Sequence, residues 1–344
     1  MNLTNIKIFL TILLVAAFVT NTGFGGPRNK LGTSAAPELL IPVGSIGTSL
    51  SGSNLSTISG IESMYWNPAG LSALSTKTGE VMFSHMNYFA DMKMEYLGGI
   101  AKLGNLGVLG ISIKSFNIGE INETSEIQPE GTGVVFKPTY IIANLGIARQ
   151  MTDRIRFGAN VKIINESVAS VSATGFGFDF GIQYTGGKTG LSFGIVLKNL
   201  GPSLTFNGAG LDRTFEINGQ KTTQRVILQS FDLPTNLEIG VGFAPKLGKD
   251  NFVNISAAFQ NSSFSSDEYR FGLEYSYKNF FYLRGAVSIF ADKQSNESLF
   301  GPTFGAGLRY PLGGITLGFD YAYRIVNESA FNTTNQFFTL NVGF

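Results

Sequence analysis

The chain has 344 residues, and its 25 basic and 24 acidic residues leave a formal charge of +1. This near-neutral balance offers no polybasic surface and argues against nucleic acid as a partner. With no cysteine and one histidine, the sequence excludes disulfides, thiol catalysis and Cys- or His-based metal sites, and no cofactor motif stands out. Charged residues are only 14% of the chain, which is low for an ordinary soluble domain.

The N-terminus, residues 1–25, is predicted to be a secretory signal peptide. Lys7 supplies a positive charge, and the apolar run 8–19 that follows is too short to span a bilayer comfortably. Gly23, Gly25 and Gly26 supply small residues for cleavage. The alternative is an uncleaved membrane anchor. Export without cysteine is typical of a bacterial envelope protein, so we expect the bacterial outer membrane as its location.

The next segment, residues 26–78, lacks a strand pattern because Pro37, Pro42 and several glycines interrupt it. It is rich in apolar residues, including Leu39, Met64 and Trp66, which are costly to leave in water. We therefore predict that it folds inward as a plug, with a flexible periplasmic leader as the alternative. The remaining residues, 79–344, are predicted to form one barrel domain.

Residues 79–344 alternate repeatedly between apolar and polar side chains. In 315–325 the odd-numbered residues are apolar or aromatic, and most of the even-numbered ones are small or charged. Successive side chains of a strand point to opposite faces, so this period predicts strands with one apolar face. The pattern predicts fourteen strands at 79–89, 92–102, 105–117, 137–151, 154–167, 171–186, 189–200, 233–244, 250–261, 267–277, 279–290, 301–311, 314–326 and 335–344.

Either a soluble sandwich or a transmembrane barrel produces this pattern. The apolar face is rich in Phe and Tyr, the other face carries Gly, Ser, Asn and isolated charges, and the segments are long. Short connections also alternate with longer ones such as 118–136 and 201–232, although the short 90–91 turn breaks the rule. The fold class is therefore predicted to be all-β, a transmembrane antiparallel β-barrel of about fourteen strands with an N-terminal plug.

The final strand alternates apolar residues and ends on Phe344. A terminal aromatic residue in this position resembles the signal that outer-membrane assembly machinery reads in bacterial barrel proteins. We therefore expect two partners at this stage, the assembly machinery and the outer-membrane lipid.

A motif in the plug segment carries a family resemblance. The run YWNPAGL is most specific, and VLKNLG at 196–201, FGAGLRY at 304–310 and LGFDYAY at 317–323 accompany it. Together they resemble the PorV/PorQ family, outer-membrane barrels associated with the type IX secretion system. The Asn-Pro-Ala core is also similar to the hatch motif of FadL-type fatty-acid transporters. The predicted plug motif comprises Tyr65, Trp66, Asn67, Pro68, Ala69, Gly70 and Leu71.

Catalysis is poorly supported, and we predict that the protein is not an enzyme. The only histidine, His85, lies on the first strand, where a rim position is the simpler interpretation than a catalytic base. The glycine-rich run 175–181 lacks the strand–turn–helix context of a nucleotide loop and fits an inward-facing strand row better.

Charged residues on the predicted inward row are mixed in sign. They could anchor the plug through ion pairs or line an open anion pore, and the cost of unpaired buried charge favours anchoring. Within one strand we expect Arg270 to pair with Glu274, and Asp320 with Arg324. The inward row comprises Arg156, Lys162, Asp179, Lys198, Glu238, Arg270, Glu274, Arg284, Arg309, Asp320 and Arg324.

Two functions remain open. The PorV/PorQ resemblance implies a docking or shuttle protein that binds the type IX translocon or the C-terminal signal domains of secreted proteins. The loop 201–232, with Phe206, Phe215 and Phe231, is the candidate partner site, or else an uncommitted surface loop. The alternative is a FadL-like transporter of hydrophobic molecules. That function calls for a lateral opening, which the glycines at 98–99, 107 and 110 could allow.

Overall fold

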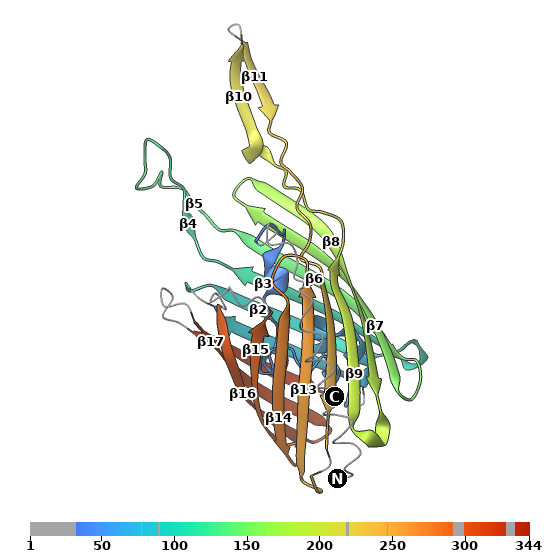
Figure 1. Cartoon of the computed structure of the whole chain (residues 1–344). Helices are drawn as coiled ribbons and strands as arrows, with labels where there is room; N and C mark the ends of the chain where they lie inside the picture. Colours follow the sequence, from blue (N-terminus) through green and yellow to red (C-terminus); the bar gives the residue numbers. More distant parts are fainter. Residues whose placement is uncertain are drawn as a thin grey trace.

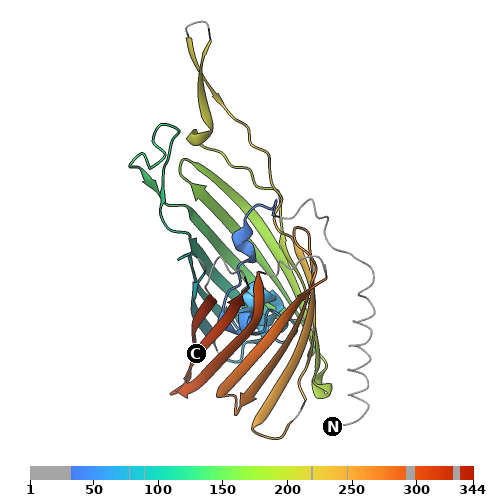
Figure 2. The same cartoon turned by 60° about the vertical axis from the view of Figure 1, so that its left-hand side comes forward.

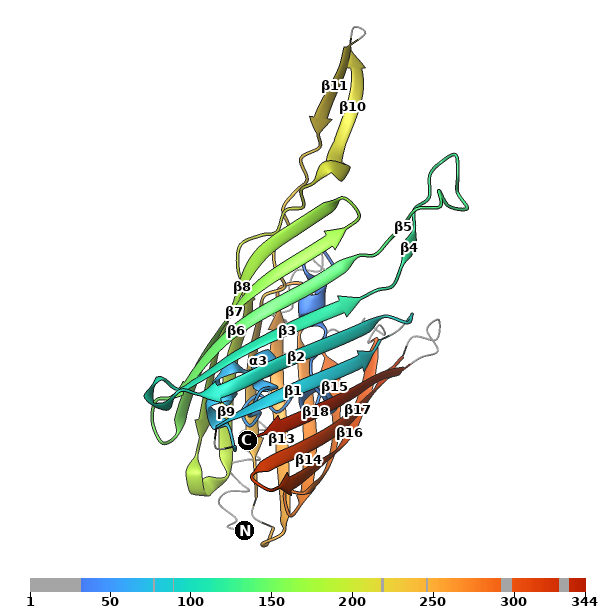
Figure 3. The same cartoon turned by 180° about the vertical axis from the view of Figure 1, so that it is seen from behind.

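The computed structural model describes residues 32–76, 78–88, 90–217, 220–245, 247–291, 299–327 and 334–344, so the predicted signal peptide lies outside the described residues. Within them, fourteen antiparallel strands close into one barrel (Figures 1 and 3). Consecutive barrel strands are neighbours, and the first pairs with the last. The predicted antiparallel barrel of about fourteen strands is confirmed.

Each predicted strand overlaps one strand of the barrel. The barrel strands are β1 (Gly79–Asn87), β2 (Lys93–Lys102), β3 (Val108–Asn117), β6 (Thr139–Gln150), β7 (Ile155–Val168), β8 (Val171–Thr185), β9 (Leu191–Leu200), β12 (Asn236–Phe243), β13 (Asn251–Ser262), β14 (Glu268–Tyr277), β15 (Phe281–Phe290), β16 (Phe300–Leu312), β17 (Ile315–Val326) and β18 (Thr334–Gly343).

Alternation places the apolar face outside. Along β8, Phe176, Phe178 and Phe180 are exposed, whereas Gly177 and Asp179 between them are buried. Outward apolar side chains are exposed to a similar degree on every strand of the barrel, including Leu145 and Ile147 on β6. A soluble sandwich would bury this face in its core, so the arrangement excludes that alternative and leaves an apolar band around a barrel.

The two ends of the barrel differ. One end, here called the turn end, carries tight connections such as 278–280, where Lys278 and Asn279 both adopt the left-handed conformation of a two-residue hairpin turn. The other, the loop end, carries the connections 118–138 and 201–235. The β7–β8 connection at 169–170 is a further short one at the loop end.

Two hairpins at the loop end were not predicted. The small pair β4 (Ile121–Asn122) and β5 (Val135–Phe136) lies in the first long loop. The longer pair β10 (Asp212–Ile217) and β11 (Gln220–Arg225) follows η7 (Ala209–Leu211) and extends well beyond the barrel (Figure 1). The described side chains of β11 are exposed throughout, so neither of its faces needs apolar residues and the sequence shows no period of two.

Residues 32–76, here called the plug, fill the barrel interior (Figure 2). The plug begins at the loop end, where Ala35 N–H donates to Asp232 O at 2.9 Å, and leads into β1 at the turn end. No helix of the described residues is long and apolar enough to cross a membrane. The plug contains η3 (Pro37–Leu40), α2 (Ser45–Ser49), α3 (Ser63–Trp66) and η4 (Pro68–Ala73), and the turns contain η5 (Gly104–Leu106) and η6 (Gly187–Thr189).

One side of the lumen is apolar, contrary to the uniformly polar inner row expected from sequence. Met82, Met86 and Met94 from β1 and β2 are fully buried and pack with Met64 and Leu71 of the plug. Methionine fills irregular gaps well because its side chain is unbranched and flexible. This contact holds the plug against β1, β2, β3 and β6.

The glycines expected to open the wall instead make room for the plug. The β2–β3 ladder is continuous from Lys93–Asn117 to Lys102–Val108. A Cβ at Gly98 would press on Ile61, and one at Gly110 on Met64. The prediction of a lateral opening at these glycines is therefore wrong.

Candidate functional site

The Asn-Pro-Ala core of the plug docks onto the wall. Asn67 Oδ1 accepts a hydrogen bond from Ala69 N–H at 3.2 Å and so caps η4. Its Nδ2 donates to Leu55 O at 3.0 Å within the plug and to Ile182 O of β8 at 3.2 Å. A Cβ at Gly158 would overlap the Pro68 backbone, which explains the inward glycine on β7. These contacts fix the plug on β7 and β8.

The two aromatic residues before this core face the other half of the lumen. Trp66 Nε1 donates to Val43 O at 3.0 Å, and the Tyr65 and Trp66 rings meet edge to face at 5.0 Å. The Lys198 Nζ lies 5.0 Å and 5.2 Å from the centres of the two rings, within cation–π range. Gly47 leaves space for the indole, because a Cβ there would overlap it.

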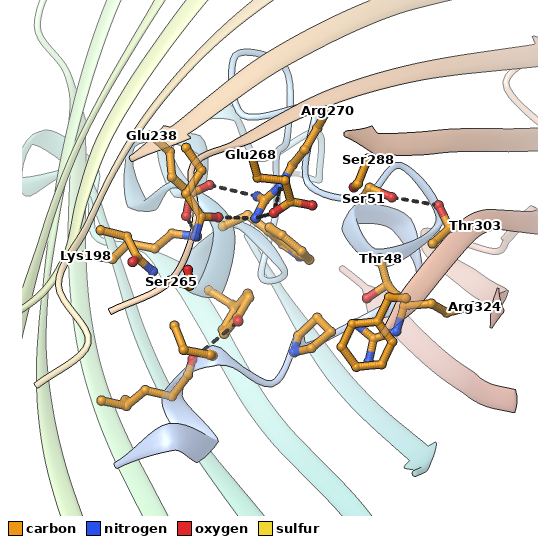
Figure 4. A pocket seen from close by; sticks show the side chains of 18 of the residues that line it. Thr48, Ser51, Lys198, Glu238, Ser265, Glu268, Arg270, Ser288, Thr303 and Arg324 are labelled. Atoms are coloured by element: carbon orange, nitrogen blue, oxygen red, sulfur yellow. Dashed lines mark hydrogen bonds and ion pairs between the residues drawn. The ribbon is translucent and has the colours of Figure 1, made fainter. Parts of the chain in front are cut away.

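A cavity of about 260 Å³ lies on the loop-end side of these rings (Figure 4). Its apolar lining comes partly from the plug and partly from β15 and β16. Its charged lining comes from β9, β12, β14 and β17. The apolar members are Leu39, Leu40, Pro42, Tyr65, Trp66, Phe290 and Phe300, and the charged members are Lys198, Glu238, Glu268, Arg270 and Arg324.

The charges of this cavity are linked across strands. Glu238 accepts from Lys198 at 2.8 Å and from Arg270 at 3.2 Å, and Arg270 also contacts Glu268 at 2.7 Å and the side chain of Gln260. The dashed lines in Figure 4 follow the contacts of Arg270. Glu238 and Glu268 therefore pair with Lys198 and Arg270. Arg324 is a third basic residue of the lining.

Arg324 is buried beside the cavity and has a different environment. Its Nε and Nη2 donate to Asn335 Oδ1 at 3.2 Å and 2.9 Å, and its guanidinium lies 3.6 Å from the centre of the Phe300 ring. Among the described residues, no carboxylate lies within 4.0 Å of this guanidinium. The cavity lining thus has a net positive charge.

The expected pairs within single strands are wrong. Arg284 joins Glu274 at 2.6 Å and Asp320 at 2.8 Å, and Arg309 joins Asp320 at 2.6 Å. Residues opposite each other on adjacent strands have Cβ atoms about 5 Å apart, whereas two inward positions further along a strand are about 13 Å away. Most ion-pair partners therefore come from other strands, whereas Glu268 and Arg270, one inward position apart, pair within β14.

Ion pairs do not anchor the plug in the way expected. Within the lumen, each ion pair of the described residues joins wall residues only, as Lys162 and Asp179 do at 2.7 Å. The wall holds the plug by donating to its carbonyl oxygens instead. Lys114 Nζ donates to Glu38 O at 2.7 Å and Ile41 O at 2.6 Å, and Asn160 Nδ2 donates to Met64 O at 2.7 Å.

The Lys-Asn pair of VLKNLG forms a bulge in β9. Asn199 has a φ of 58°, and the β8–β9 register shifts there. Its N–H donates to Asp179 Oδ1 at 2.8 Å, its Nδ2 donates to Pro234 O at 3.1 Å, and its Oδ1 accepts from Lys162 Nζ at 2.7 Å. The bulge lets both Lys198 and Asn199 face inward, which strict alternation forbids.

Two buried carboxyl groups of the plug have perturbed acidity. Burial raises the pKa of Glu62 to about 8, although its carboxyl accepts hydrogen bonds from Gly47 N–H at 2.6 Å and Ile46 N–H at 3.3 Å. Burial, followed by the neighbouring Glu166 carboxyl, raises the pKa of Glu38 to about 8. Both groups favour their neutral form more than an exposed glutamate does.

A second cavity, of about 620 Å³, lies at the turn end and is lined by Arg156, Lys188 and plug residues 56–59. Arg156 contacts Thr185 Oγ1 at 3.4 Å and is remote from the cavity at the loop end. The plug therefore lies between two cavities, one at each end of the barrel.

The other candidate residues lie apart from both cavities. His85 faces outward on β1 and contacts Asn87 at 3.1 Å, and no group of three or more metal-ligating side chains occurs among the described residues. Phe206 packs near the apolar cluster at the loop end, Phe215 is exposed on β10, and Phe231 pairs with Leu204. The three phenylalanines do not form one surface. Phe344 pairs with Gly79 through two backbone hydrogen bonds of 3.0 Å.

Sequence reasoning missed several residues of the site. Lys114 faces inward, and its signal was available because Leu109, Ile111 and Ile113 mark the outward row of β3. The plug residues that line the cavity, Leu39, Leu40 and Pro42, carry no periodic signal, since their position depends on the plug fold alone.

Comparison with solved structures finds barrels of similar fold at low sequence identity. It is similar to the "CymD monoaromatic hydrocarbon channel", with 13% identity, a TM-score of 0.55, and coverage of 89% of this chain and 98% of that one. It is also similar to the Pseudomonas putida toluene transporter TodX, with 12% identity, a TM-score of 0.54, and coverage of 88% and 97%. A Pseudomonas aeruginosa FadL homologue gives 10% identity, a TM-score of 0.51, and coverage of 94% and 99%.

These likenesses define the fold as a FadL-like outer-membrane barrel, and at such identities they show the fold alone. No family model and no curated protein sequence matches the chain. The specific resemblance to the PorV/PorQ family therefore has no support from these comparisons.

Proposed function

We propose that this protein is an outer-membrane channel, rather than an enzyme, which takes up a small amphipathic molecule with a hydrophobic body and an anionic head. In this proposal, residues 1–25 direct export, and the assembly machinery inserts the barrel by reading its last strand, which ends at Phe344. The outward apolar band then contacts lipid. The fold supports the proposal because its structural neighbours include channels for monoaromatic hydrocarbons.

The loop-end cavity is the observation that carries the proposal. Its apolar lining includes Leu39, Leu40 and the Trp66 ring, which favour a hydrophobic body by about 25 cal/mol per Å² of buried apolar surface. Its third basic group, Arg324, has no carboxylate partner among the described residues and favours an anionic head, because a charge in a poorly hydrated site attracts a counter-ion strongly. A purely hydrocarbon ligand would make no ionic contact with Arg324.

The single tryptophan of the chain provides a direct test. Trp66 lines the cavity, so a bromine atom on a bound ligand quenches its fluorescence on contact. We expect saturable quenching by undecanoate brominated at its terminal carbon, weaker quenching by the matching bromo-alcohol, and reversal by plain undecanoate. Quenching that is absent, or that rises linearly without saturation for both compounds, would contradict the proposal.

The hairpin β10–β11 favours a second candidate function, docking of a protein partner. It extends beyond the barrel, Phe215 on it is exposed, and Ile227 just after it is 93% exposed. A type IX translocon or the C-terminal signal domain of a secreted protein would bind here. Pull-down from native outer membranes with the full chain, compared with a variant in which residues 212–225 are replaced by a short Gly-Ser turn, tests this. Partners that co-purify equally with both variants would exclude the hairpin as their site.

A further inference from the structure

The turn-end cavity has two basic groups in its lining. Arg156 of β7 and Lys188 of η6 line it, together with residues of β8, β9 and β12. Among its described lining residues there is no aspartate or glutamate. The loop-end cavity differs, because Glu238 and Glu268 pair with basic residues there. The turn-end cavity therefore carries a positive charge that no carboxylate of its described lining balances.

The guanidinium of Arg156 is only partly satisfied. Its Nη1 donates to Thr185 Oγ1 over a long 3.4 Å, and its Nε is buried without a partner among the described residues. No carboxylate of the described residues lies within 4.0 Å of this guanidinium. A charged donor that is buried without an acceptor is costly, so the site favours a ligand that accepts from Arg156.

Hydroxyl groups of the plug and of the wall surround the two basic groups. Ser192 Oγ of β9 donates to Ser56 Oγ of the plug at 3.0 Å. Gly242 makes room for this contact, because a Cβ there would overlap both hydroxyl groups. Cations together with hydroxyl donors suit an oxyanion, whose oxygens accept several hydrogen bonds. The hydroxyl residues that line the cavity are Ser56, Thr57, Ser59, Thr185, Thr189 and Ser192.

The charge and size of the cavity distinguish between oxyanions. Two basic groups without a carboxylate attract a dianion more strongly than a monoanion. A phosphate monoester carries about −1.5 to −2 charges at pH 7 and three acceptor oxygens, whereas a carboxylate carries one charge and two oxygens. The volume of about 620 Å³ is typical of sites for small organic ligands. Leu191, Phe243 and Pro245 supply apolar surface for an organic part.

We propose that the turn-end cavity binds a phosphate group, carried by a small soluble ester or by a lipid headgroup, between the wall and the plug. Arg156 and Lys188 neutralise its charge, and Ser56 and Ser59 bind it from the plug. Lys188 and Ser59 are exposed, so the cavity is open to solvent at the turn end. The bound phosphate group therefore links the plug to the wall at the end opposite the loop-end cavity. This site does not depend on the proposed uptake function.

Isothermal titration calorimetry with glycerol 3-phosphate tests the site on the full chain in a neutral detergent. We expect saturable binding with a Kd of about 1 mM or tighter, and about tenfold weaker binding by Arg156→Met. Lys188→Gln should also weaken binding, whereas Lys188→Arg should retain it. The matched control, Arg154→Met, removes an exposed arginine of the same end that does not line the cavity, and should bind like the unmodified protein. Absence of saturation, or equal losses in Arg154→Met and Arg156→Met, would overturn the proposal.

A second titrant distinguishes the two sources of the phosphate group. Dihexanoylphosphatidylglycerol, used below its micelle concentration, presents a lipid headgroup, whereas glycerol 3-phosphate is a soluble ester. If the lipid binds more tightly and its binding depends on Arg156, the site takes a headgroup. If glycerol 3-phosphate binds more tightly, the site takes a soluble ester.

Hydrogen exchange tests the link to the plug. Glycerol 3-phosphate should slow exchange in residues 55–60 of the unmodified protein but not of Arg156→Met, because a ligand of the docked plug stabilises it. If binding saturates while exchange in 55–60 is unchanged, the plug is not part of the site and the proposed link is wrong. Trp66 quenching by bromo-undecanoate should be the same in Arg156→Met. Failure of the phosphate site therefore leaves the proposed uptake function standing, and absent quenching in the unmodified protein rejects uptake alone.

Discussion

The two halves of the barrel wall differ in what they contact. The half formed by β1, β2, β3, β6, β7 and β8 holds the plug through Met82, Met86, the docking of Asn67 and a series of inward glycines. Among its strand pairs, β2–β3, β3–β6 and β6–β7 have continuous ladders. The half formed by β9 and by β12 to β18 carries the charged cavity lining, and its β15–β16 ladder ends at Ala286–Thr303, short of the ends of both strands.

This difference indicates that the two halves of the barrel wall have different roles. Dense apolar packing and shape-matched glycines fix a segment in one arrangement, because interiors at this density resist small displacements. The second half also contacts the plug closely, because Cβ atoms at Gly272 and Gly305 would press on Ser53 and Ser49. It differs from the first half in its ion pairs, its hydroxyl contacts and the cavity that the plug leaves unfilled.

The largest expected effect concerns pH and the plug carboxyl Glu62. Burial raises the folded-state pKa of Glu62 from 4.5 to about 8, so the folded plug binds the proton more tightly than the unfolded chain does. The stability of the docked plug therefore falls as pH rises from 4.5 to about 8, by roughly 4 kcal/mol. The guanidinium midpoint of the Trp66 emission shift should fall over this window, and Glu62→Gln should flatten the change. If the midpoint of Glu62→Gln changes equally steeply with pH, a group other than Glu62 causes the pH dependence.

The next effect tests how firmly Asn67 holds the plug against β7 and β8. Asn67→Ala removes the bonds to Ala69 N–H, Leu55 O and Ile182 O. Leu55 O still accepts from Gln183 Nε2, but the buried Ala69 N–H loses its acceptor, which costs about 1–3 kcal/mol. We expect the plug to detach first, seen as faster hydrogen exchange in residues 55–70. Asn165→Ala, which loses only an exposed bond to Thr174, is the control. Equal exchange in both variants would show that Asn67 does not anchor the plug.

Two inward glycines on adjacent strands test the contact between the wall and the plug in a second way. At Gly158 a Cβ would overlap the Pro68 backbone, whereas at Gly177 it would make ordinary contacts at 3.6–3.8 Å. Gly158→Ala should cost about 2 kcal/mol by overpacking and raise single-channel conductance as the plug shifts. Gly177→Ala should do neither. Similar conductance in both variants would contradict the shape-matching role of the wall glycines.

The sequence predicts the barrel well because every barrel strand separates two different environments. Alternation in 315–325 reports this contrast directly, and the β10–β11 hairpin was missed because both of its faces meet solvent. Alternation fixes the row on which Arg270 and Asp320 lie, but pairing depends on register between strands. Turn geometry sets that register, so the partners of both residues were assigned wrongly.

The candidate site was less predictable for a related reason. The cavity depends on how the plug fills the lumen, and the plug has no periodicity from which its path follows. One local signal was present, however. Pro302 stands inside the predicted strand 301–311, and proline within a strand indicates an edge or a bulge, which is where the ladder ends. The glycines at 98–99, 107 and 110 gave a false signal of an opening, because the β2–β3 ladder is continuous there.

The smallest expected effect tests the charge of the loop-end cavity, in the half formed by β9 and by β12 to β18. Arg324→Met keeps the bulk of the side chain beside Phe300 but removes its charge, so affinity for an anionic head should fall by about tenfold, or about 1.4 kcal/mol. Trp66 quenching by bromo-undecanoate measures this, and the bromo-alcohol should bind both forms alike. Arg156→Met changes the same type of charge at the turn-end cavity and should leave both affinities unchanged. If both substitutions weaken acid binding equally, the attraction comes from the overall charge of the lumen rather than from the cavity beside β15 and β16.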